Sequence, residues 1–413
     1  MTIVSMLTLY IEGKGKDELM RVAIIGAGIG GLTAAAALRA NDIDDVVVYE
    51  KAHELREVGA GVVIASNGLR ALDAVGLGDR VRAVGTPIER TLWHTWQGEG
   101  VPVPPAWPSV SPDRPVTSLP VHRGELQQAL LSALPEGTVH LGRPCQDIVE
   151  TANEVRIVFA DGSEEHADIA VGADGIHSAV QRVVADPVEL SSDGIMAYRG
   201  LIPVEPLGGA VDLDSMQMWL GPGRSFLIYP VSQRRLLNVV AFTANNLDAE
   251  ESWTAPGDVA ELAVEFAGWD RPVQRVVEAM TETFRWGLYD RKPLSRWTTD
   301  RIALLGDAVH PMTPHLGQGA NMSIEDAVVL ATVLAGASAA DIPRRLGLYE
   351  SLRRDRTTRV QRNARQTGHV YRSVDLTPQQ QAAQLIEILT GNWIPDYDAA
   401  AAAGAALARS NPC

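Results

Sequence analysis

The sequence predicts an α/β protein: a Rossmann-like domain, an antiparallel sheet inserted into it, and helices toward the C-terminal end. Three observations support this fold class. Residues 21–50 read as strand, glycine turn, helix and strand. Residues 191–290 instead hold short strand-like runs with aromatic side chains. An apolar strand at 301–305 then precedes a helical stretch over 319–334, which returns the chain to the first domain.

Length and composition narrow the classes of protein. At 413 residues the chain suits two packed domains, and 46% hydrophobic with 21% charged residues is ordinary for a globular protein. A net charge of −15 argues against binding to nucleic acid. The two cysteines, Cys145 and Cys413, exclude a disulfide framework and a cysteine-based zinc site, and indicate a cytoplasmic protein.

The sequence gives no sign of a membrane segment, because no apolar run approaches the roughly 20 residues that span a bilayer. Residues 1–19 hold a short apolar run without a basic start, followed by charged residues. That pattern disfavours a signal peptide, so we predict a disordered extension before the domain begins near Met20.

Successive elements follow from local patterns. Residues 21–25 and 46–50 read as buried parallel strands around a small-residue helix at 30–40. Further on, the sequence predicts a helix at 66–75, a long proline-rich loop at 98–120, a helix at 124–134, and a hairpin at 154–172 that turns at Asp161-Gly162.

The second half of the chain changes from strands to helices. Strand-like runs recur at 195–201, 216–220, 225–229 and 236–242. Arginine-rich helices fill 343–370, and the alanine-rich tail at 398–410 reads as a frayed helix or as disorder. We therefore predict a nucleotide-binding domain from 20–90, 113–190 and 291–365, a substrate domain from 91–112 and 191–290, and a C-terminal helical segment over 366–413.

A glycine motif follows the first strand. Gly26, Gly28 and Gly31 satisfy GxGxxG within the run Gly26-Ala27-Gly28-Ile29-Gly30-Gly31. Such glycines permit a tight turn, let backbone approach a pyrophosphate, and let the helix pack on the strand. Glu50 stands at the end of the next strand, where a carboxylate accepts hydrogen bonds from an adenosine ribose. The context predicts a dinucleotide site.

Two later motifs also follow predicted strands. Asp307 comes directly after the strand at 301–305, either as a ligand of the bound molecule or as a helix cap. The turn from Gly317 to Asn321 opens a long helix, and its small residues suit negative charge on a bound ring. The stretch Gly172-Ala173-Asp174-Gly175, taken alone, is better explained as a turn capped by Asp174.

In this order and spacing the three motifs resemble the group A flavoprotein monooxygenases, which share the fold of 4-hydroxybenzoate hydroxylase. The resemblance is greatest to the branch of salicylate hydroxylase, 3-hydroxybenzoate 6-hydroxylase and 6-hydroxynicotinate 3-monooxygenase. It runs from about Val22 to Tyr397 and includes residues 57–62, 121–126, 198–200 and 392–398. It implies a Rossmann-like FAD-binding domain, an inserted antiparallel-sheet substrate domain and C-terminal helices.

The resemblance implies a set of cofactor-binding residues. The pyrophosphate and ribose of tightly but non-covalently bound FAD would contact the glycine turn and Glu50, Asp307 the ribityl chain, and the 317–321 turn the flavin ring. Asp174 would serve both FAD and the nicotinamide nucleotide. The full set of cofactor-binding candidates is Gly26, Ala27, Gly28, Gly30, Gly31, Glu50, Lys51, Arg56, Gly61, Val62, Arg123, Asp174, Asp307, Gly317, Gly319, Ala320 and Asn321.

The activity implied by the resemblance is a single-component hydroxylation. NAD(P)H reduces the flavin, O2 gives a flavin C4a-hydroperoxide, and one oxygen atom passes to a small aromatic substrate. Relatives often carry a histidine where this chain has Ser225, and a serine is a poor base at neutral pH. Either another group activates the substrate or the substrate needs no deprotonation.

The candidate catalytic residues are Tyr229 and His315. By analogy the substrate pocket lies between the flavin and the middle sheet, and its candidate residues are Arg199, Gln217, Trp219, Ser225, Tyr229, Pro311 and His315. Arg56 is equally well explained as a surface charge, and His310 is better explained as a structural residue. We expect a monomer or homodimer that takes a small-molecule substrate.

Three other functions are compatible with the same fold. A flavin epoxidase or a hydroxylase of a larger natural product keeps the oxygen chemistry, and the absence of a histidine at Ser225 favours it. A flavin dehydrogenase would consume no O2. A non-catalytic, ligand-binding flavoprotein would bind its ligand without stimulated NAD(P)H oxidation.

Overall fold

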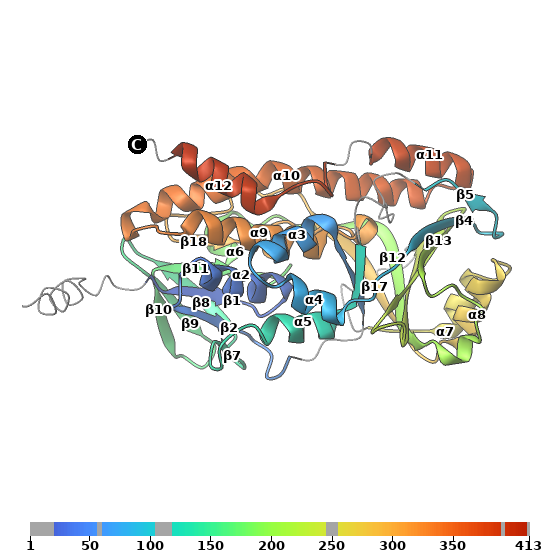
Figure 1. Ribbon diagram of the computed structural model, residues 1–413, viewed down its shortest axis with the longest axis horizontal. Helices are drawn as coiled ribbons and strands as arrows, with labels where there is room; N and C mark the ends of the chain where they lie inside the picture. Colours follow the sequence, from blue (N-terminus) through green and yellow to red (C-terminus); the bar gives the residue numbers. More distant parts are fainter. Residues whose placement is uncertain (1–19, 56–59, 104–117, 245–254, 390–392, 411–413) are drawn as a thin grey trace, which may run out of the picture.

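The computed structural model describes residues 20–55, 60–103, 118–244, 255–389 and 393–410. Two sheets lie side by side along the molecule, and long helices run across the top of both (Figure 1). The smaller sheet is parallel, with strand order β18-β11-β1-β2-β7. Its strands are β1 (Val22–Ile25), β2 (Val46–Tyr49), β7 (Val139–His140), β11 (Ile169–Gly172) and β18 (Ile302–Leu304).

The parallel sheet forms from short runs that are buried throughout. All four residues of β1, β2 and β11 are buried, because helices cover the sheet and leave no solvent face. Helices α2 (Ile29–Ala40) and α9 (Gly319–Leu334) pack against each other over it. The predicted strands at 21–25 and 46–50 and the helices at 30–40 and 319–334 agree with these elements.

The larger sheet has eight strands in the order β16-β17-β12-β15-β14-β13-β4-β5. Neighbouring strands pair antiparallel except β13 with β4, which run parallel. The four strands predicted between 195 and 242 all belong to it. Its strands are β4 (Arg90–Thr95), β5 (Gly100–Val101), β12 (Leu190–Pro203), β13 (Ser215–Gly221), β14 (Arg224–Val231), β15 (Leu236–Ala244), β16 (Pro256–Gly257) and β17 (Thr283–Arg291).

The two faces of this sheet pack against different partners. Trp219, Phe226 and Ile228 face outward and form a core with Leu262 and Phe266, which belong to α7 or directly follow it. Helices α7 (Val259–Glu265) and α8 (Arg271–Ala279) cover this outer side (Figure 1). Because side chains alternate along a strand, the neighbouring residues point to the opposite, inner face, toward the parallel-sheet domain.

Two small sheets complete the strand inventory. β8 (Cys145–Glu150), β9 (Val155–Phe159) and β10 (Glu164–Ala167) form a three-stranded sheet that contains the predicted hairpin. β3 (Gly61–Ala65) pairs antiparallel with β6 (Ser118–His122). The predicted loop over 98–120 was therefore wrong at its end: Pro120 lies opposite Val63 in a two-stranded sheet, where a proline without an N–H is tolerated. Residues 104–117 of that loop lie outside the described residues.

The remaining helices lie around the domains. The arginine-rich stretch is one continuous helix, α10, and the alanine-rich tail is a helix, α12, that packs against α9. The helices not yet bounded are α3 (Ser66–Ala74), α4 (Gly78–Val84), α5 (Arg123–Leu131), α6 (Gln181–Val184), α10 (Ile342–Tyr371), α11 (Pro378–Ile388) and α12 (Ala399–Ser410), with 3-10 turns at Glu205–Leu207, Gly306–Ala308, Pro314–Leu316 and Ala339–Asp341.

The proposed extension over 1–19 lies outside the described residues. In the part of the chain that is described, no helix combines the length and apolar character needed to cross a bilayer.

Candidate active site

A cavity of about 1060 Å³ lies where the strand ends of the parallel sheet meet the inner face of the larger sheet. Such a volume is at the upper end of the range for small-molecule sites, and it suits a cofactor together with a substrate. Gly28, Gly30 and Asp307 line one end, and Met218, Leu227 and other residues of the larger sheet line the other.

The glycine turn after β1 has the geometry that the sequence predicts. Gly26 has φ +109°, and a Cβ there would lie 2.3 Å from the Ala173 carbonyl oxygen. A Cβ at Gly31 would lie 1.9 Å from the Gly26 carbonyl oxygen, so the helix packs directly on the turn. Gly28 is the residue directly before α2, and no side chain caps this helix start. The space where a Cβ of residue 28 would stand is open. The free N–H groups of this helix start therefore suit a phosphate.

Glu50 braces the same turn from the end of β2. One carboxylate oxygen accepts a hydrogen bond from the Ala27 N–H at 2.8 Å, and the other from the Ala52 N–H at 2.9 Å. Ala27, Glu50 and the exposed Lys51 do not line the cavity. Arg56 lies outside the described residues.

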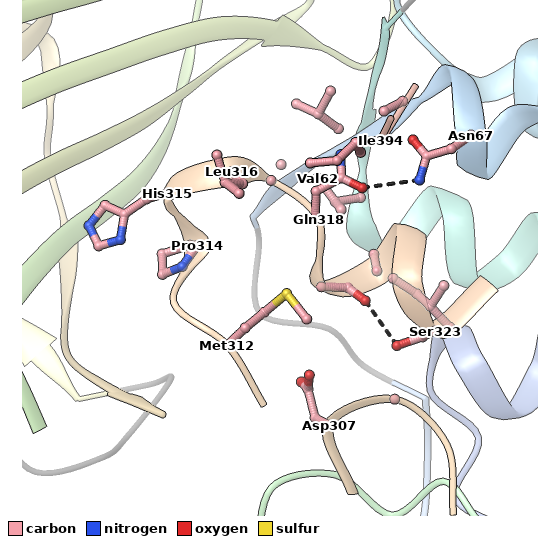
Figure 2. Close-up of a pocket in the computed structure, with 18 of the residues that line it drawn as sticks. Val62, Asn67, Asp307, Met312, Pro314, His315, Leu316, Gln318, Ser323 and Ile394 are labelled. Carbon is pink, nitrogen blue, oxygen red and sulfur yellow. Dashed lines mark hydrogen bonds between the residues drawn. The ribbon is translucent and has the colours of Figure 1, made fainter. Parts of the chain in front are cut away.

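Asp307 extends from the 3-10 turn after β18 toward the cavity (Figure 2). Among the described residues its carboxylate has no hydrogen-bond or ion-pair partner. Enclosure by protein raises its pKa, while His310 and Arg123 nearby act in the opposite direction. Arg123 opens α5 and lines the same cavity. An unpartnered carboxylate in this position suits a ligand with hydroxyl groups.

The start of α9 forms the facing wall. Gly317 adopts a left-handed conformation with φ +60°, and Gly317, Gly319 and Ala320 line the cavity. Helix α9 receives no side-chain cap, so its first N–H groups are open to a bound anion. The Gln318 side chain, which would otherwise cap it, accepts a hydrogen bond from Asn67 at 3.1 Å (Figure 2).

Asn321 has a different place from the one predicted for it. Its side chain accepts a hydrogen bond from the Ala65 N–H at 2.9 Å and donates to the carbonyls of Val63 at 3.0 Å and Gly317 at 2.8 Å. It does not line the cavity, because its side-chain hydrogen bonds connect β3 to the Gly317 turn. Gly68 makes room for it, since a Cβ there would lie 2.2 Å from the Asn321 oxygen.

Asp174 is engaged as a cap. It accepts hydrogen bonds from the Ser178 hydroxyl, from the Ala179 N–H at 2.7 Å and from the Val180 N–H at 3.3 Å. Burial raises its pKa and these bonds lower it, with burial the larger effect. The cavity wall at this point consists of Ala173, Gly175 and Ile176. This geometry matches the cap interpretation of the motif.

Gly61 and Val62 lie on β3 and line the cavity where β3 meets the larger sheet. The Gly61 N–H donates to the Asn238 side-chain oxygen at 2.6 Å. A Cβ at Gly61 would lie 2.6 Å from the Tyr229 ring, so only glycine allows this approach without a shift. Tyr229 is buried and lines the cavity. Burial raises its pKa to about 12, against the opposing effect of Arg199, so its phenol stays neutral at physiological pH.

Arg199 is the charged residue of the sheet floor. It lies on β12, lines the cavity, and its guanidinium is 5.4 Å from the centre of the Trp286 ring. Met216, Met218, Leu227, Val240 and Phe242 supply most of the floor and are apolar, and the aromatic residues Tyr229, Trp286 and Tyr289 complete it. An arginine in apolar surroundings is suited to bind a carboxylate through paired hydrogen bonds.

His315 forms the end of the cavity next to the floor. It is 3% exposed and packs on Phe242, with ring centres 5.0 Å apart. Burial lowers its pKa to about 3, and the positive charges of Arg372 and His369 act in the same direction. Its imidazole is therefore neutral, which makes it a hydrogen-bonding group and a weak base. Pro311 also lines the cavity, and its carbonyl accepts a hydrogen bond from Gln361 at 2.9 Å.

The lowered pKa predicts how His315 affects stability with pH. A histidine in the unfolded chain takes up a proton below about pH 6.5, whereas His315 in the folded state does so only near 3. Folding stability therefore falls as pH decreases through this range. We expect His315→Gln to gain stability relative to the natural protein by up to about 1.4 kcal/mol per pH unit between pH 6 and 4. Urea unfolding at several pH values measures this, and a constant difference would contradict it.

Three of the predicted pocket residues do not line the cavity. Gln217 and Trp219 point to the outer face of β13, where they bond to the Asp212 carbonyl and the Asp270 carboxylate, and their neighbours Met216 and Met218 line the cavity instead. The sequence analysis selected the wrong set of alternate residues because β13 is buried on both faces, so its sequence does not show which face lines the cavity. Ser225 is fully buried next to Phe242 and does not line the cavity.

The structure also adds residues that the sequence analysis did not select for the site. They come from helices and from the C-terminal segment, where no glycine motif marks them. Arg70 donates to the carbonyls of Pro395 and Tyr397 at 3.1 and 2.9 Å, which holds that segment against the cavity. The added lining residues include Asn67, Arg70, Tyr371, Trp393, Ile394, Pro395 and Asp398.

Comparison with known proteins identifies this class of fold and site. The family described as "FAD binding domain" matches residues 19–364. The chain is 38% identical to 3-amino-4-hydroxybenzoate 2-monooxygenase of Streptomyces cremeus, over 87% of this chain and 89% of that protein. It is 35% identical to 6-hydroxynicotinate 3-monooxygenase of Bordetella bronchiseptica, over 83% and 90%.

Solved structures agree with the sequence relatives. A substrate complex of salicylate hydroxylase superposes with a TM-score of 0.80 at 29% identity, covering 94% of this chain and 98% of that one. HpxO of Klebsiella pneumoniae, complexed with FAD and uric acid, gives 0.78 at 30% identity, covering 96% and 98%.

The chain therefore belongs to the FAD-binding monooxygenase family. Within this family, the protein is a flavin-dependent aromatic hydroxylase. The fold class, cofactor and activity predicted from the sequence are therefore confirmed.

Proposed function

We propose that this enzyme hydroxylates the ring of a small aromatic carboxylate, with Arg199 binding the carboxylate. The observation that carries the proposal is the placement of charge around the cavity. Of the described lining residues, the arginines are Arg70, Arg123 and Arg199. Arg70 is bound to backbone carbonyls, and Arg123 stands at the nucleotide end, at the start of α5. Arg199 alone rises from the apolar floor, which suits a ligand with one negative charge and an apolar ring.

The names of the relatives support the same substrate class. The Streptomyces cremeus protein is named for an aminohydroxybenzoate, and a Pseudomonas putida relative that is 33% identical is named salicylate hydroxylase. All of these substrates carry a carboxylate on an aromatic ring.

The residues around the nucleotide end fit FAD. We assign the pyrophosphate to the α2 start at Gly28 and Gly30, with Gly26, Ala27 and Gly31 shaping the turn. We assign the adenosine ribose to Glu50, outside the cavity, because each Glu50 oxygen accepts one backbone hydrogen bond and can accept another. Asp307 would bind the ribityl hydroxyls, and the N–H groups of Gly319 and Ala320 the flavin ring. Gly61 and Val62 would lie along its edge. The unpartnered Asp307 carboxylate and the uncapped helix starts are the features that such a ligand satisfies.

Bound FAD supplies the redox chemistry that no side chain here provides, accepting a hydride from NAD(P)H and activating O2. The overall reaction consumes one O2, one NAD(P)H and one proton, and gives the hydroxylated acid, NAD(P)+ and water. The protein's part is to hold the ring over the floor of Met218, Leu227 and Val240, to keep water out, and to stabilise negative charge with the α9 start. Tyr229 and His315 act as neutral hydrogen-bonding groups.

The test is a substrate screen on the purified holoenzyme. We expect hydroxy- and aminobenzoates to accelerate NAD(P)H oxidation far more than the matching carboxamides do, and to give a product with one added oxygen atom from labelled O2. Acceleration by carboxamides as strong as by the acids would overturn the proposal. Oxidation without incorporated oxygen would equally count against it.

The sequence-based expectation of a cytoplasmic monomer or homodimer stands as part of this proposal. Light scattering of the eluted holoenzyme distinguishes the two oligomeric states.

Replacing Asp307 with alanine is expected to weaken FAD binding. Hydrogen bonds to a charged group contribute about 1.5–3 kcal/mol, so the dissociation constant should rise about 10- to 100-fold. Titration of the apoprotein with FAD, followed by flavin fluorescence, measures this. Asp355→Ala, at an exposed position on α10, is the matched control and should bind FAD normally. Unchanged FAD affinity in Asp307→Ala would show that this carboxylate does not contact the cofactor.

A further inference from the structure

Tyr371 is a buried polar residue at the edge of the cavity. It is the last residue of α10, beyond the region that the family description matches, and it is 2% exposed. It lines the cavity, and among the described residues its hydroxyl has no hydrogen-bond partner. Burial raises its pKa, so it stays a neutral phenol and can donate a hydrogen bond.

His315 lies beside Tyr371 and is also without a partner. The two ring centres are 5.7 Å apart at an interplanar angle of 61°. Neither nitrogen of His315 has a hydrogen-bond partner among the described residues, although the ring is almost fully buried. A buried polar group without a hydrogen-bond partner destabilises the protein. Two such groups that line one cavity side by side indicate a ligand group that satisfies both.

The strand register places this pair relative to Arg199. Arg199 on β12 lies opposite Val240 on β15. Phe242, on which His315 packs, follows two residues later on the same face of β15. At about 3.3 Å per residue, this displacement is about 7 Å along the floor. A single benzene ring with its substituents spans such a distance.

We propose that Tyr371 and His315 together bind a hydroxyl substituent of the substrate ring, at the end of the ring away from the carboxylate. Tyr371 donates a hydrogen bond to the substituent's oxygen, and the substituent's own hydrogen is donated to a nitrogen of His315. A hydroxyl satisfies both groups at once, because it donates and accepts. This subsite rests on the proposed function, because Arg199 must bind the carboxylate at the opposite end of the substrate.

The test compares the binding of 4-hydroxybenzoate and benzoate to the FAD-loaded enzyme, followed by the change in flavin absorbance. One neutral hydrogen bond contributes about 0.5–1.5 kcal/mol, so we expect Tyr371→Phe to lower the preference for the hydroxy acid about 2- to 13-fold. Benzoate should bind as before. Tyr198→Phe is the matched control, because its hydroxyl lies on the outer face near Glu261, and it should keep the natural preference.

The possible outcomes separate the subsite from the proposed function. An unchanged preference in Tyr371→Phe, or an equal loss for both acids, would overturn the subsite while leaving the role of Arg199 intact. A natural enzyme that binds neither acid would remove both proposals. His315→Phe is a second variant that tests the same subsite, in case Tyr371→Phe does not fold. It should also reduce the preference for the hydroxy acid. Retained FAD and an unchanged unfolding temperature show that each variant is folded.

Discussion

Arg353→Met is expected to lower the free energy of unfolding by about 3–5 kcal/mol, the cost of breaking a buried ion pair from one side. The Arg353 side chain is fully buried and lies 2.7 Å from both the Glu325 and the Asp326 carboxylate, which are also fully buried. Burial alone would raise the pKa of Asp326, but His310 and Arg353 lower it to about 2. Without the guanidinium, this charge loses one of the two groups that lower its pKa inside the protein.

The loss should affect the two carboxylates unequally. Glu325 keeps Arg356, whose guanidinium nitrogens lie 2.7 and 2.8 Å from its oxygens. Within the described part of the chain, Asp326 keeps only His310 and the Gly306 N–H, which donates to it at 3.0 Å. Since Gly306 directly precedes Asp307, the variant should also hold FAD less tightly.

Urea unfolding measures the stability, and the chain offers a matched control. Arg354 is the next residue on α10, but its side chain is 41% exposed and its partner Glu350 lies one helical turn away. Arg354→Met should therefore cost no more than about 1 kcal/mol. In Arg353→Met/Asp326→Asn the unpaired charge is gone, so part of the stability should return. Equal effects of Arg353→Met and Arg354→Met would contradict the argument.

The sequence was most informative where local chemistry determines the backbone. The glycine turn at Gly26 and Gly28, the strand before Asp307 and the helix that starts at Gly319 were all placed correctly, because each depends on neighbouring residues only. The antiparallel strands of the larger sheet were found for the same reason. Together these elements determine the family and the cofactor.

The substrate side was harder to predict because it depends on long-range packing. In β13, apolar residues cover both faces, so no pattern distinguishes Met218, which lines the cavity, from Trp219, which does not. Asn321 was predicted to bind the cofactor. Its side-chain oxygen instead accepts a hydrogen bond from the N–H of Ala65, which is more than 250 positions away in the sequence. Tyr371 lies at the end of a helix whose sequence gives no sign of a site.

Arg199→Met is expected to lower kcat/KM for the preferred aromatic acid about 30- to 5000-fold. Removing one member of a buried, hydrogen-bonded charge pair costs about 2–5 kcal/mol, because the carboxylate then enters an apolar pocket without a counter-charge. The matching carboxamide has no charge to compensate, so its slow turnover should hardly change. The variant should therefore lose the preference for acid over amide while it retains FAD.

Two further variants distinguish charge recognition from a general disturbance of the floor. Arg199→Lys keeps the positive charge but not the planar fork, and should fall between the natural enzyme and Arg199→Met. Arg80→Met, at an exposed position on α4, should behave as the natural enzyme. If Arg199→Met instead slows acid and amide by the same factor, the guanidinium serves only to support Trp286 and Tyr229, and the enzyme recognises its substrate by the ring rather than by the carboxylate.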